Sequence, residues 1–210
     1  MKLLFKSRLL NNISWLFILN ISNRIIPFFT FPYITRIFLP EGFGIIAFSL
    51  AFISYFQILI DYGFNLTGAR KVATVEGNQK ELSKVYTIIF STKFILFLLS
   101  IPLIILITLL NSKLYEYREI IFVFILLAFS HVLVPTWLFQ GLQRVKELTI
   151  ITIIVRIVFL ISVFTFIKSK DDILLYAFLY SISFLLIGLI SVIIDHYRIN
   201  ITSCRITIKQ

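Results

Sequence analysis

Long apolar runs alternate with short polar segments along the whole chain. Six of these runs are long enough for an α-helix to cross a bilayer, which needs about 20 apolar residues. They cover approximately Ile13–Phe38, Phe43–Phe64, Val85–Leu110, Ile120–Phe139, Leu148–Ile167 and Ile173–Asp195. The pattern predicts an all-α polytopic membrane protein, with residues 1–210 forming a single membrane domain of six transmembrane helices.

Prolines and one polar segment modify this picture. Pro27 and Pro32 predict a kink or local break in the first span, where neighbouring helices can satisfy the freed carbonyl groups. Pro102 and Pro135 predict bends in the third and fourth spans. The longest polar segment, Thr67–Lys84, predicts a cytoplasmic loop with a short amphipathic helix.

Composition supports the membrane class. The chain is 59% hydrophobic, only 14% charged, and has a mean hydropathy of +0.98. A soluble domain is about half apolar and about one quarter charged. The single cysteine, Cys204, excludes an internal disulfide.

The net charge of +10 is spread through the connections between spans, so it indicates membrane orientation rather than a nucleic-acid partner. Twelve Lys or Arg residues lie in both terminal segments and in the second and fourth connections, against five on the other side. Positive charge favours the cytoplasmic side. We therefore expect both termini to be cytoplasmic.

Three cations lie inside the apolar runs: Arg24, Lys93 and Arg156. A cation at membrane depth costs about 3 kcal/mol or more unless it faces a bundle interior or a watery cavity. The three residues therefore predict a cationic cavity that binds an anion. Arginine suits a phosphate or pyrophosphate, because its planar fork can bind two oxygens at once.

Helical spacing places polar side chains on shared faces, as expected for helices around a polar cavity. Asn20, Asn23 and Arg24 share a face of the first span, Ser54, Gln57 and Asp61 a face of the second, and Thr149, Thr152 and Arg156 a face of the fifth. We take Arg24, Arg156, Lys93, Asn23, Gln57 and Asp61 as candidate substrate-binding residues. Two have simpler alternatives: Lys93 could snorkel to the interface, and Asp61 could cap a helix or pair with a loop cation.

The sequence gives little support to an enzyme. It has no paired Cys/His set for a metal, no Gly-rich phosphate loop before a helix and no HExxH motif. We expect no cofactor and no catalytic residue.

Several motifs resemble the amino-terminal region of Wzx-type O-antigen and polysaccharide flippases, of the multidrug/oligosaccharidyl-lipid/polysaccharide exporter superfamily. The matching motifs are Pro32-Tyr33-Ile34-Thr35-Arg36, Gly42-Phe43-Gly44, Asp61-Tyr62-Gly63-Phe64, Ala69-Arg70 and Pro135-Thr136-Trp137-Leu138-Phe139-Gln140-Gly141. The resemblance implies one six-helix lobe of a MATE-like fold.

The resemblance also implies a function. Such proteins move an undecaprenyl-pyrophosphate-linked oligosaccharide from the cytoplasmic to the periplasmic leaflet of the bacterial inner membrane by alternating access. Their partners would be the lipid-linked oligosaccharide, membrane lipid and the proteins of polysaccharide polymerisation and assembly. Two alternatives remain open: a small-molecule exporter of the same superfamily, and a non-transporting membrane subunit of a polysaccharide assembly complex.

One departure from the family concerns length. Flippases of this type usually have two six-helix lobes, and this sequence accounts for one. The second lobe is therefore expected to be absent. Either the chain is a truncated product, or it pairs with another copy or with a separate partner.

Overall fold

The described part of the chain is entirely helical in the computed structural model. The backbone is described for residues 2–198, and the side chains for residues 12–196 apart from 24, 26 and 27. The elements are α1 (Lys2–Asp61), α2 (Phe64–Thr74), α3 (Gln79–Leu110), α4 (Ser112–Glu116), α5 (Arg118–Leu133), α6 (Thr136–Gly141), α7 (Val145–Phe166), the 3₁₀ turn η1 (Lys170–Asp172) and α8 (Ile173–Arg198). The predicted all-α polytopic class is confirmed.

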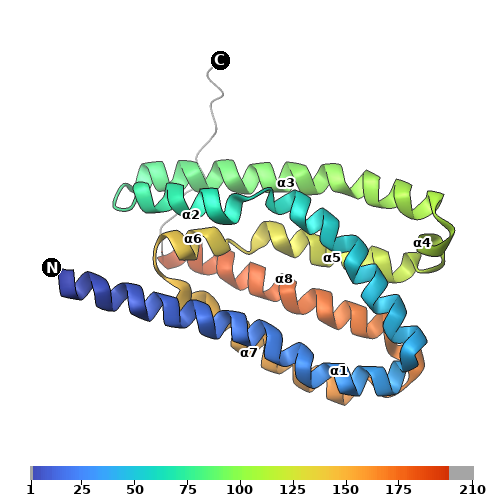
Figure 1. Ribbon diagram of the computed structural model, residues 1–210. Helices are drawn as coiled ribbons and strands as arrows, with labels where there is room; N and C mark the ends of the chain where they lie inside the picture. The colour runs from blue at the N-terminus through green and yellow to red at the C-terminus, as the bar shows by residue number, and fades with distance from the viewer. Residues whose placement is uncertain (1, 199–210) are drawn as a thin grey trace.

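Helix α1 folds back on itself at Leu39 (Figure 1). Leu39 has φ 60° and ψ 171°, which no helix can accommodate, and the residue before a proline is disfavoured in the helical region. The fold-back separates an arm that contains the first predicted span from an arm that contains the second. The predicted break at Pro27 or Pro32 is not found, because helical dihedral angles continue through both. Membrane helices tolerate proline where neighbouring groups satisfy the freed carbonyls.

The two arms of α1 contact different helices. In the first arm, the hydroxyl of Tyr33 donates to the backbone carbonyl of Ile167 at 2.7 Å, next to the end of α7. In the second arm, Phe48 packs edge-on against Tyr117 at the start of α5. Figure 1 shows α5 and α8 between α3 on one side and α7 on the other.

The lengths and apolarity of the helices suit a membrane. Five helical stretches of the described residues are long and apolar enough to cross one, and the first of them, Asn12–Thr74, contains the fold-back at Leu39. Large apolar side chains such as Tyr55, Ile58 and Leu110 are more than two-thirds exposed. A surface of this kind is compatible with lipid rather than water.

The predicted cytoplasmic segment Thr67–Lys84 is more helical than expected. It is divided between α2, a turn at Val75–Asn78, and the first turns of α3. The expected short amphipathic helix is α2, whose Gly68 and Val72 are buried while Lys71 is exposed. The side chain of Asn78 accepts from the backbone N–H of Glu81 and caps α3.

Pro135 divides the fourth predicted span, as expected, whereas Pro102 lies inside an uninterrupted α3. Helix α5 ends at Leu133, and α6 begins at Thr136. Close to this break, α8 approaches α5 through Gly188, where an added Cβ would lie 2.6 Å from the Cβ of Leu133. A glycine is therefore required for this helix contact.

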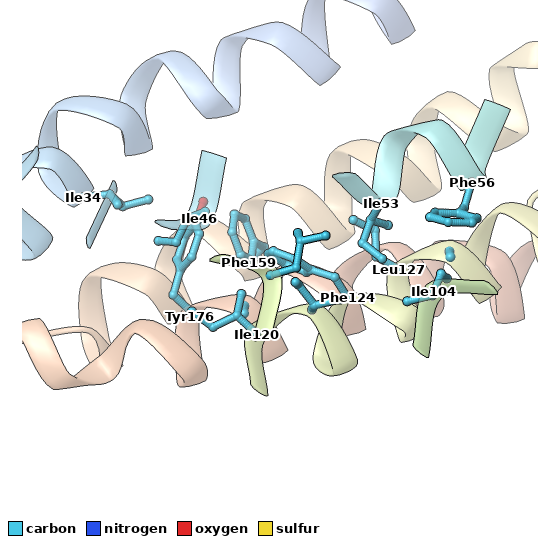
Figure 2. Close-up of a cluster of buried hydrophobic side chains, with 14 of the residues drawn as sticks. Ile34, Ile46, Ile53, Phe56, Ile104, Ile120, Phe124, Leu127, Phe159 and Tyr176 are labelled. Carbon is cyan, nitrogen blue, oxygen red and sulfur yellow. The ribbon is translucent and has the colours of Figure 1, made fainter. Parts of the chain in front are cut away.

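The largest apolar cluster fills the space between the second arm of α1 and helices α5, α7 and α8. Ile53 and Phe124 are fully buried there, together with Ile104 of α3 (Figure 2). This cluster holds together the helices that carry the polar groups described next.

Candidate functional site

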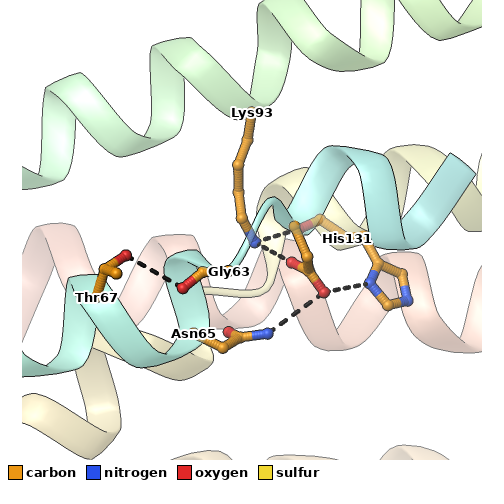
Figure 3. A network of polar contacts seen from close by, with 6 residues as sticks. Gly63, Asn65, Thr67, Lys93 and His131 are labelled. Carbon is orange, nitrogen blue, oxygen red and sulfur yellow. Dashed lines mark hydrogen bonds and ion pairs between the residues drawn. The ribbon is translucent and has the colours of Figure 1, made fainter.

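The end of α1 carries a buried ion pair. The Nζ of Lys93, in α3, lies 2.6 Å from Oδ1 of Asp61 and donates to the backbone carbonyl of His131 at 3.1 Å (Figure 3). The residue Lys93 is 1% exposed. The ammonium group of Lys93 therefore points into the helix bundle, and Lys93 does not snorkel to the interface.

The second carboxylate oxygen of Asp61 has its own neighbours. Oδ2 lies 3.4 Å from Nδ1 of His131 in α5, and the amide of Asn65 in α2 donates to it at 3.3 Å. Four helices thus meet at one carboxylate. Sequence reasoning considered a loop cation as the partner of Asp61, but the partner is a cation within the third predicted span.

A polar cavity of about 250 Å³ opens beside this network. It is bordered by amide, hydroxyl, imidazole and carboxylate groups as well as apolar side chains. Its lining residues are Leu16, Leu19, Asn20, Asn23, Asp61, Asn65, Ser130, His131, Val134, Thr136, Gln140, Leu148, Thr152, Phe184 and Ile187. We call it the amide cavity, after Asn20, Asn23, Asn65 and Gln140.

The structure brings together some of the candidate residues and not others. Asn23 and Asp61 line the amide cavity, whereas Gln57, Lys93 and Arg156 do not. The side chain of Arg24 lies outside the described residues. Asn65 and Gln140 were not among the residues predicted from the sequence: Asn65 follows the predicted second span, which ended at Phe64, and Gln140 was included only in the motif that begins at Pro135.

Arg156 borders a second cavity, of about 180 Å³, between α1, α7 and α8. The residue is 3% exposed, and its Nε and Nη1 have no hydrogen-bond partner among the described residues. Its guanidinium carbon lies 4.0 Å from the centroid of the Phe184 ring and 6.0 Å from that of Tyr180. We call this the arginine cavity.

Of the candidate cations whose side chains the structure describes, Lys93 and Arg156 both lie outside the lining of the amide cavity. Thr152, one helical turn before Arg156 on α7, lines the amide cavity, and Phe184 lines it while its ring covers the guanidinium. Helical spacing correctly placed Thr152 and Arg156 on one face. It could not show that an aromatic side chain of α8 covers the guanidinium and also lines the amide cavity.

Sequence reasoning missed one buried acid. Asp195, near the end of α8, is 1% exposed and lies close enough to Glu147 and Tyr86 for electrostatic interaction. The signal in the sequence is an acid at the end of the last apolar run. The described residues contain no group of three or more His, Cys, Asp or Glu side chains that could hold a metal ion.

Comparison with known proteins identifies relatives. The model of the polysaccharide biosynthesis protein family matches residues 9–204. A protein of Escherichia coli strain K12 is 30% identical over 189 residues, which are 90% of this chain and 46% of the relative. A protein of Shigella dysenteriae is 31% identical over 184 residues, which are 86% of this chain and 45% of the relative.

Both relatives carry the name "Putative O-antigen transporter". The chain spans about half the length of these curated relatives. No solved structure matches it. The family match covers most of the chain, including the fold-back, the buried ion pair and both cavities, and the chain therefore belongs to the polysaccharide biosynthesis protein family.

Proposed function

We propose that this chain forms one half of a transporter that moves an undecaprenyl-pyrophosphate-linked oligosaccharide across the bacterial cytoplasmic membrane. The family match and the names of both relatives support transport of a polysaccharide precursor. The apolar helices support a multi-pass membrane location. The positive charge of the terminal segments and of two connections supports cytoplasmic termini.

The observation that carries the proposal is that Arg156 is buried while two of its guanidinium nitrogens have no hydrogen-bond partner among the described residues. A buried guanidinium with two open N–H donors beside a cavity is costly to keep, and such intramembrane charges usually serve a function. Two N–H groups of one guanidinium can bind two oxygens of a phosphate or pyrophosphate. On this proposal Arg156 binds the pyrophosphate group, with Arg24 as a second cation proposed from the sequence.

On this proposal the chain supplies one wall of the transport path. A substrate-sized path between two membrane faces needs a second wall, and the chain spans about half the length of its relatives. We propose that a separate partner or a second copy supplies the other half, and that the two halves rock around the site by alternating access. Leu39 and Pro135, where the helices are interrupted, are the proposed hinges.

A small-molecule exporter of the same superfamily is a second candidate. Buried acids would suit a cationic cargo, and Asp61 and Asp195 are largely buried. Lys93 already neutralises Asp61, however, which leaves Asp195 as the main support for this function.

Deletion and complementation test the proposal. In a strain lacking the gene, we expect loss of surface polysaccharide and accumulation of lipid-linked glycan on the cytoplasmic leaflet, both restored by the 210-residue chain in its native strain. Arg156→Ala should fail to restore either, and Arg156→Lys should restore them only in part, because one ammonium cannot bind two oxygens in a fixed fork.

Thr165→Ala, at an exposed position of the same helix, is the control for protein abundance and insertion. If Arg24→Ala and Arg156→Ala both support normal surface polysaccharide at normal abundance, the cation-dependent mechanism is wrong. Unchanged polysaccharide with increased sensitivity to cationic drugs after deletion would favour the exporter.

A further inference from the structure

We infer that the amide cavity binds one uncharged sugar ring of the substrate and rejects acidic sugars. This inference rests on the proposed function, since it assumes a glycan substrate. It assigns the sugar to a compartment different from that of the pyrophosphate, because Arg156 does not line the amide cavity.

The lining matches the hydrogen-bonding chemistry of a sugar. A primary amide both donates and accepts, as a sugar hydroxyl does. Among the described residues, no hydrogen bond occupies the side-chain amides of Asn23 or Gln140, which lie on α1 and α6. These two amides are therefore available to a ligand that enters between the helices.

The carboxylate at the cavity wall selects for ligands that donate hydrogen bonds. Asp61 contributes a carboxylate to the lining, whereas its counter-ion Lys93 lies behind it, outside the lining. A hydroxyl can donate to this carboxylate, whereas the ionised carboxylate of an acidic sugar only accepts hydrogen bonds and offers it none. The imidazole of His131 is the other titratable group at this wall, and it is already beside Asp61.

Size and shape limit the ligand to about one ring. The cavity of about 250 Å³ is smaller than the roughly 300–1,000 Å³ of pockets that hold drug-sized ligands. Apolar side chains, among them Leu148, Phe184 and Ile187, form part of its wall. An apolar and aromatic wall suits the C–H face of a sugar ring, with the amides facing its hydroxyls.

Binding of matched glycosides to the full chain in lipid nanodiscs tests this inference. The probes are methyl glucoside and methyl glucuronide. They differ only at C6, which is a hydroxymethyl group in the glucoside and a carboxylate in the glucuronide. The readout is the fluorescence of the two tryptophans, Trp15 and Trp137, which are sequence neighbours of the lining residues Leu16 and Thr136. We expect saturable binding of the glucoside and at least about tenfold weaker binding of the glucuronide.

Variants assign the binding to the cavity. Asn23→Ala combined with Gln140→Ala should weaken glucoside binding about tenfold or more, since two hydrogen bonds are lost. Thr165→Ala, which removes an exposed polar side chain outside the lining, should leave it unchanged. Asp61→Asn combined with Lys93→Met removes both charges, and should let the glucuronide bind as tightly as the glucoside.

Two results would overturn the inference: equal binding of both glycosides by the unaltered chain, or glucoside binding that survives in the Asn23/Gln140 double variant. A second measurement distinguishes failure of this inference from failure of the proposed function. It compares the binding of farnesyl pyrophosphate to the unaltered chain and to Arg156→Gln. Arg156-dependent binding of the pyrophosphate without sugar binding leaves the proposed function standing. Sugar binding without Arg156-dependent pyrophosphate binding or complementation contradicts the proposed function instead.

Discussion

The guanidinium carbon of Arg156 lies 4.0 Å from the centroid of the Phe184 ring, and that ring also borders the amide cavity. One aromatic side chain of α8 therefore stabilises a buried cation of α7 and also forms part of the wall of the amide cavity. A desolvated cation–π contact contributes about 2 kcal/mol or more. The contact explains how a guanidinium with two open donors can remain inside an apolar bundle.

Replacing the ring tests this relationship. Phe184→Leu should lower the thermal stability of the purified chain, because the cation loses its aromatic partner while most of the apolar volume is kept. The expected loss is about 1–2 kcal/mol, measured by thermal unfolding in detergent. Phe178→Leu, at an exposed position of α8, is the control, and equal losses in the two variants would contradict a special role for Phe184.

Removing Arg156 should separate stability from function. Arg156→Met eliminates a buried charge with two unpartnered donors, so we expect a melting temperature at or above that of the unaltered chain. The same variant should fail to restore surface polysaccharide in the deletion strain. A strong fall in melting temperature would instead identify Arg156 as a structural residue.

The buried ion pair should behave as a coupled unit. Asp61→Asn or Lys93→Met alone should each destabilise the chain by about 3–5 kcal/mol, because either change leaves one charge without its partner. The double variant should recover most of this loss. A double-mutant cycle by thermal unfolding checks the coupling, and additive losses would show that the two side chains act independently.

The close approach of α8 to α5 requires a glycine. Gly188→Ala places a methyl group 2.6 Å from the Cβ of Leu133, so the helices must separate and stability should fall by about 1–3 kcal/mol. Gly44→Ala is a matched control, because no atom lies within 4 Å of its added Cβ. We expect no loss at Gly44, where alanine also favours the helix.

The apolar runs determined much of the fold without help from tertiary structure. A run of about 20 apolar residues with few charges can be stable only as a helix in a membrane, because every backbone group must be satisfied within the segment. Pro135 likewise ended a helix as expected, since proline removes a donor and restricts its predecessor. Helical dihedral angles continue through Pro27 in α1, and membrane helices tolerate proline where other groups satisfy the freed carbonyl.

The burial of Arg156 could also be predicted from sequence, since helical spacing relates residues of one helix. The groups that surround Arg156 could not be predicted from the sequence. Asp61 meets Lys93 from 32 positions away and His131 from 70, and Phe184 covers Arg156 from another helix. The period of a helix fixes which residues share a face, but not which helix packs against that face. The tertiary structure alone therefore decided that Lys93 pairs with Asp61, that Arg156 has no acidic partner among the described residues, and that Arg156 lies outside the cavity that the amides line.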